Sequence, residues 1–145
     1  MSIYLRLQAR KDPQIISGNT KEMVYDGSGL YRINPVYRTL LQRSLISVNV
    51  MGSGYDCARF WEILAARAML FTQKLDIEIP YPFTDGVSYV TFASLEEFED
   101  KLAYYLEHLD EVEKIARRGH EHLLLYHTSQ KRAEYFLEVC KQIII

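Results

Sequence analysis

The stretch that most constrains the fold covers residues 45–72 and reads LISVNVMGSGYDCARFWEILAARAMLFT. An apolar run predicts a buried strand, the glycine-bearing loop after it a turn, and the alanine-rich segment a helix. A second apolar run then predicts another buried strand. The order strand, loop, helix, strand is typical of α/β proteins with a parallel sheet, which bind anionic ligands at the turn from strand to helix.

The residues of this turn suit a phosphate group. Gly52 and Gly54 lack a Cβ atom, so a bulky anion can approach the backbone closely. Asp56 or Ser53 is expected to cap the helix by accepting hydrogen bonds from its first N–H groups. The helix start carries roughly half a positive charge, and Arg59 lies one turn inside the helix, where it can add a charge-assisted bond.

Glu62 lies about two turns beyond the loop, so a phosphate cradle is followed by a carboxylate. This arrangement suits a nucleotide, with the diphosphate at the turn and the ribose hydroxyls at the acid. The local pattern equally fits a tight connector followed by a solvated helix residue, because a Gly-x-Gly sequence alone is weakly specific. Both interpretations stay open at this level.

Composition excludes several classes of protein. The 145 residues are 48% hydrophobic and 25% charged, as in an ordinary globular domain. A net charge of −2 without a Lys/Arg block disfavours nucleic acid and anionic membranes as partners. No apolar run reaches the roughly 18 residues that span a bilayer. Two cysteines form no disulfide framework and the first residues lack a signal-peptide core, so we expect a cytoplasmic protein.

Residues 1–44 are mixed: residues 3–9 alternate like a strand, a loop-rich segment follows, and residues 34–44 predict a short helix with Pro35 at its first position.

The tail is helical after a predicted strand over 87–92. Ser94 with Glu97, and Asp110 with a glutamate three residues on, predict capping boxes, and Thr128 predicts the cap of a third helix. The apolar spacing predicts an inner face on each helix, made in the third of Ala133, Phe136, Leu137 and Cys140.

His120, His122 and His127 lie close together in this tail. Zinc prefers histidines four residues apart or a nearby cysteine pair, and neither pattern is present. We therefore expect no metal site, and expect these histidines to make ordinary hydrogen bonds.

Three blocks of the chain, in order, resemble the C-terminal half of group 1 glycosyltransferases, most closely the branch named after a bacterial spore maturation protein. The blocks are RSLISVNVMGSGYDCARFWEILAARAMLFTQ, FTDGVSYVTFASLEEFEDKLAYYLEH and EKIARRGHEHLLLYHTSQKRAEYFLE. The resemblance implies a Rossmann-like half of the two-domain architecture called GT-B, with a mainly parallel sheet of about four strands flanked by helices. It also implies that residues 1–145 form one domain that binds a nucleoside diphosphate sugar, with no separate cofactor.

Carried over by position, Glu62 falls where such enzymes hold the donor ribose, and Gly52, Ser53 and Gly54 fall on the loop whose amides face the diphosphate. Two further donor contacts are our own expectations: Tyr55 stacks on the base and Arg59 pairs with a phosphate.

The chain also departs from the family pattern. In many members a second glutamate precedes the ribose-binding acid with seven residues between them; here that position is Gly54, and a usual small residue is replaced by Arg67. We therefore assign no catalytic residue. Only about forty residues precede the match, whereas the acceptor-binding N-terminal half is much larger, so we expect the chain to be the C-terminal half of a longer transferase. The alternative is a module that binds a nucleotide or docks a partner without catalysis.

Overall fold

The computed structural model describes residues 24–25, 31–32, 35–52 and 54–144, and the chain divides into two compact units, Met1–Leu40 and Leu41–Ile145. In the first unit, β1 (Val24–Tyr25) pairs antiparallel with β2 (Tyr31–Arg32). The strand expected over residues 3–9 lies outside the described residues. The prediction that all 145 residues form one domain of a longer protein stays a prediction.

Helix α2 (Pro35–Arg43) crosses the boundary between the units and begins at Pro35, as expected. The fixed φ angle of proline suits a first helical position, where its missing N–H costs no hydrogen bond. The expected cap residue, Asn34, lies outside the described residues.

The second unit contains a parallel sheet in the order β3-β4-β5, built from β3 (Ile46–Asn49), β4 (Met69–Gln73) and β5 (Val90–Phe92). Ile46 pairs with Met69, and Phe71 with Val90. Helix α3 (Ala58–Ala65) makes the crossover from β3 to β4. The mixed α/β class with a parallel sheet flanked by helices is confirmed, although in the described part of the chain the parallel sheet has three strands rather than about four.

Core side chains lie on both faces of β4, because successive residues of a strand point to opposite sides. Leu70 packs in a cluster with Phe60 of α3 and with Leu123 of the long helix α5 (Leu109–Tyr126). Phe71 stacks on Phe98 of α4 (Leu95–Glu107), with ring centroids 5.0 Å apart. The central strand is therefore covered on both sides, which explains its unbroken apolar sequence.

The predicted caps of the tail helices agree with the structure in two of three cases. Ser94 accepts a bond from the Glu97 N–H at 3.1 Å, and Thr128 accepts one from the Lys131 N–H at 3.3 Å. The box expected at Asp110 is wrong: α5 begins at Leu109, with His108 as an N-cap that makes no side-chain capping bond to the helix. His108 is also the C-cap of α4, so it is the single residue between the two helices.

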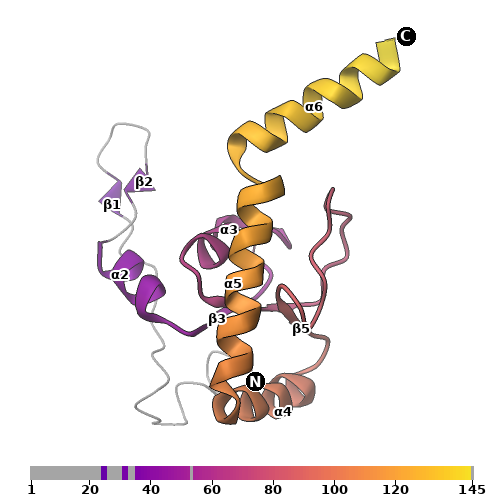
Figure 1. Ribbon diagram of the computed structural model, residues 1–145. Coiled ribbons are helices and arrows are strands. Elements are labelled where there is room, and N and C mark those ends of the chain that lie inside the picture. The colour runs from indigo at the N-terminus through magenta and orange to yellow at the C-terminus, as the bar shows by residue number, and fades with distance from the viewer. Residues whose placement is uncertain (1–23, 26–30, 33–34, 53, 145) are drawn as a thin grey trace. The chain divides into compact units, whose positions relative to one another are not determined.

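Helix α6 (Ser129–Ile144) does not bury the face that its sequence predicts. Phe136 is 65% exposed and Leu137 57% exposed, so the expected inner face is wrong. In Figure 1, α6 (yellow) turns away from the end of α5 (orange) and projects outward. Within the described residues, no helix combines the length and apolarity that crossing a membrane would require.

Candidate functional site at the carboxyl end of the sheet

The turn between β3 and α3 lies where parallel α/β sheets bind ligands, at the carboxyl end of the strands. The Gly52 N–H donates to the Gly54 carbonyl oxygen at 3.3 Å, which folds the turn back on itself. A Cβ atom added at Gly52 or Gly54 would meet none of the described residues within 4 Å, so these residues leave the space above the glycines open. Ser53 lies outside the described residues.

The start of α3 differs from the prediction. Its N-cap is Cys57, which makes no side-chain capping bond, so the expected cap at Asp56 is wrong. The chain is still extended at Cys57, with φ −57° and ψ 166°, and the Asp56 carbonyl oxygen instead accepts the indole N–H of Trp61 at 3.1 Å. The first N–H groups of α3 therefore lie beside the open turn without a side-chain cap from the N-cap residue.

A polar cluster missed by the sequence analysis joins the turn to the ends of the strands. Asn49 ends β3 and is 1% exposed. Its Nδ2 donates to Thr72 Oγ1 at 3.1 Å and to the Tyr55 carbonyl oxygen at 3.4 Å, while its Oδ1 accepts from Cys57 Sγ at 3.3 Å. Gln73 Oε1 accepts the Met51 N–H at 2.8 Å. The turn is therefore fastened at several points to β3 and β4.

Part of the signal for this cluster was present in the sequence, although the register of the two strands was not. Asn49 and Thr72 are polar residues at the ends of two apolar runs. Adjacent parallel strands end at the same side of a sheet, and these two residues are direct register partners.

Arg59 and Glu62 lie three residues apart on α3, so their side chains lie on neighbouring positions of one helix surface. Both are half-buried, as is Tyr55 in the turn. Phe60 and Ile63, at neighbouring positions of the same helix, are fully buried, so Arg59 and Glu62 lie at the margin of the buried face. The helix therefore leaves these two charged side chains outside its core face, and their roles as ligand contacts stay predictions.

Aromatic rings surround the histidine that ends α5. His127 is 7% exposed and stacks on Phe83 with ring centroids 4.8 Å apart, while Trp61 lies 5.3 Å away. Burial lowers the pKa of His127 from 6.5 to about 4, although its bond to the Tyr81 carbonyl oxygen opposes that shift. His127 is therefore neutral at physiological pH and packs as an aromatic ring. Its Nδ1 is buried and has no hydrogen-bond partner among the described residues.

The three histidines make the ordinary backbone bonds expected of them. His120 Nδ1 donates to the Leu64 carbonyl oxygen at 2.9 Å. His122 Nε2 and His127 Nε2 both donate to the carbonyl oxygen of Tyr81, at 2.9 and 3.0 Å. Across the described residues, no group of three or more His, Cys, Asp or Glu side chains is placed to hold a metal ion.

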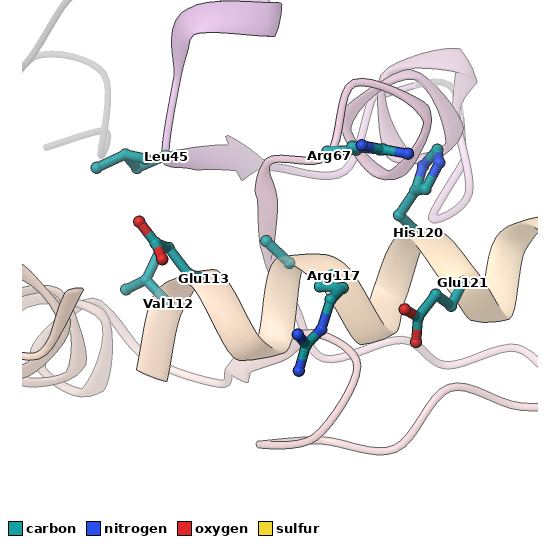
Figure 2. Close-up of a pocket in the computed structure, with 8 residues that line it drawn as sticks. Leu45, Arg67, Val112, Glu113, Arg117, His120 and Glu121 are labelled. Carbon is teal, nitrogen blue, oxygen red and sulfur yellow. The ribbon is translucent and has the colours of Figure 1, made fainter. Parts of the chain in front are cut away.

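A cavity of about 350 Å³ lies at the opposite, amino end of the sheet. Figure 2 shows Arg67 and His120 at one end of it and Leu45 and Glu113 at the other. Arg67, which replaces a usual small residue of the family, follows α3 and precedes β4, so it lies away from the β3–α3 turn. It therefore does not line the proposed donor site.

The comparisons with known proteins identify the family. The family described as glycosyl transferase-like matches residues 16–138, which is most of the chain. The chain therefore belongs to the glycosyl transferase-like family. No curated protein and no solved structure matches it significantly.

Proposed function

We propose that this chain binds the nucleoside diphosphate sugar of a glycosyltransferase at the turn between β3 and α3. The observation that carries the proposal is the family match over residues 16–138, combined with an open glycine turn at the carboxyl end of a parallel sheet. Amides of the turn, formed by Gly52, Ser53 and Gly54, and of the start of α3 would bind the diphosphate, with the two glycines allowing close approach.

Side chains of the turn and of α3 complete the proposed site. Arg59 would pair with a phosphate, Glu62 would accept hydrogen bonds from the ribose hydroxyls, and Tyr55 would stack on the base. Charge on the departing diphosphate would then be neutralised by oriented N–H dipoles and a guanidinium, so we propose that no resident metal is required.

The wider proposal places this chain in a longer protein. The second unit would be the donor-binding half of a GT-B enzyme of the spore maturation protein-like branch, and a separate N-terminal domain would bind the acceptor. Both cysteines, Cys57 and Cys140, are free thiols, which favours a reducing compartment such as the cytoplasm.

A second candidate is a module that binds a nucleotide or a partner without transferring sugar. It is favoured by Gly54, which occupies the position of the glutamate that contacts the transferred sugar in many relatives. Transfer assays on the full-length gene product, with release of nucleoside diphosphate as the readout, separate the two candidates.

Binding is tested by titrating uridine diphosphate and guanosine diphosphate into the protein in a calorimeter. Glu62→Ala should lower the affinity for whichever nucleotide binds by at least tenfold, because a charged hydrogen bond is worth about 1.5–3 kcal/mol. The matched control is Glu121→Ala, which removes an exposed acid at the amino end of the sheet and should leave affinity unchanged. Equal affinity of Glu62→Ala and wild type would exclude the ribose role, and no binding by wild type would refute the donor site.

A further inference from the structure

The side chain of Asn49 joins three segments that are separate in the sequence. It ends β3, donates to Thr72 on β4, and bonds to both Tyr55 and Cys57 on either side of Asp56. We infer that Asn49 is a positioning residue, which holds the backbone amides at the start of α3 in the direction needed to bind a diphosphate. This inference rests on the proposed function.

The chemistry of the cluster requires an amide at position 49. The two Nδ2 protons meet two acceptors, Thr72 Oγ1 at 3.1 Å and the Tyr55 carbonyl oxygen at 3.4 Å, while Oδ1 meets a donor, Cys57 Sγ at 3.3 Å. A carboxylate supplies acceptors only, so aspartate would face the Tyr55 carbonyl oxygen with a second oxygen. At 1% exposure, water cannot replace a lost partner.

The bonded atoms lie where they control the anion-binding amides. Tyr55 and Cys57 flank Asp56, and Cys57 is the N-cap of α3. Fixing the carbonyl group of residue 55 and the side chain of residue 57 restricts rotation of the peptide units between them. Amides that are ordered before the ligand arrives bind it without a further entropy cost, so affinity depends on this restraint.

A purely structural role predicts something different. If Asn49 only stabilised the fold, removing its bonds would lower stability and would reduce the affinities for the nucleoside and for the nucleoside diphosphate by the same factor. A positioning role predicts a loss confined to the diphosphate, because the base and the ribose contact other side chains. The ratio of the affinities for a nucleoside diphosphate and its parent nucleoside measures this difference.

Two variants remove bonds while keeping side-chain shape. Thr72→Val deletes the Oγ1 acceptor, and Asn49→Asp deletes both Nδ2 donors. Dissociation constants are measured for uridine and uridine diphosphate, and for guanosine and guanosine diphosphate, by calorimetry or by NMR shifts. We expect diphosphate affinity to fall about fivefold in Thr72→Val and at least tenfold in Asn49→Asp, with nucleoside affinity within twofold of wild type.

Controls keep the test decisive. Thr91→Val is the matched substitution on β5, where the hydroxyl donates to Asp85 and not to the turn, so the affinity ratio should not change. Circular dichroism and melting temperature establish that each variant is folded. If Asn49→Asp does not fold, the affinity ratio of Thr72→Val alone decides the test.

The outcomes separate the inference from the proposed function. If wild type binds neither diphosphate, the proposed function fails and the inference fails with it. If wild type binds but the folded variants keep its affinity ratio, the inference alone is wrong. Equal losses for nucleoside and diphosphate also overturn it, since they show a general structural role.

Discussion

The two ends of the parallel sheet are built in different ways. At the carboxyl end, buried polar side chains of β3 and β4 fasten an open glycine turn, and the cluster includes Asn49 and Thr72. At the amino end, helix packing is so close that Gly119 of α5 has no room for a side chain against Ser88. Arg67 lies there with a φ of 63°, in the left-handed region.

This difference teaches where a ligand site is to be sought. The cavity of about 350 Å³ lies at the amino end, where arginines and glutamates of opposite charge share its lining. The carboxyl end has the oriented amides and the buried polar support that an anion requires. This cavity therefore does not coincide with the proposed donor site.

The largest effect that sharpens this comparison is expected from Gly119→Ala. An added Cβ atom would lie 2.3 Å from the Ser88 carbonyl oxygen and 3.0 Å from Leu64 Cδ2. The backbone of α5 or of the Ser88 segment must shift, and we expect unfolding free energy to fall by about 3 kcal/mol in urea denaturation.

The matched control is Gly52→Ala at the carboxyl end, where no described residue lies within 4 Å of the added atom. Its unfolding free energy should stay within about 0.5 kcal/mol of wild type. Similar stability of the two variants would show that the ends of the sheet do not differ in packing as described.

A smaller effect is expected from pH. The pKa of His127 is about 4 in the folded protein against 6.5 for an unperturbed histidine, so the unfolded chain binds more protons between these values. Stability is therefore complete above pH 6.5 and falls as the pH drops toward 4. We expect a loss of about 2 kcal/mol, less than the whole shift implies, because His127 is not completely removed from solvent.

Urea denaturation at pH values from 4 to 7 measures this loss. His127→Gln keeps an N–H for the Tyr81 carbonyl oxygen but cannot be protonated, so its stability should vary less over this range. The same slope in wild type and variant would assign the pH dependence to other groups.

Much of the fold was predictable because it follows from local rules. Apolar runs and glycines gave β3, α3 and β4 in order, and side-chain oxygens at Ser94 and Thr128 marked two helix starts. The helix start at Asp110 was predicted wrongly, because a residue caps a helix only where the chain before it is not yet helical. Here α4 and α5 share His108 as their boundary, and Asp110 instead pairs with Lys114 at 2.9 Å.

The features that could not be predicted depend on contacts between distant segments. The apolar period of α6 shows which face is apolar but not whether anything covers it, and Phe136 is exposed. The Asn49 cluster needs the register of β3 against β4, which no local pattern specifies. For Glu62, the sequence position suggested a ligand role, and only binding measurements can test that role.

The smallest effect concerns the amino end and is expected to stabilise the protein. Arg67 has a φ of 63°, which costs an L-residue roughly 1–2 kcal/mol and costs glycine almost nothing. The greater entropy of glycine in the unfolded chain offsets part of this gain, so Arg67→Gly should raise unfolding free energy by about 0.5 kcal/mol. Ala66→Gly is the matched control: with a φ of −76°, it should lower stability. Nucleotide affinity should not change in Arg67→Gly if the ligand binds at the carboxyl end. A lower affinity for the nucleoside diphosphate would instead place the ligand at the amino end.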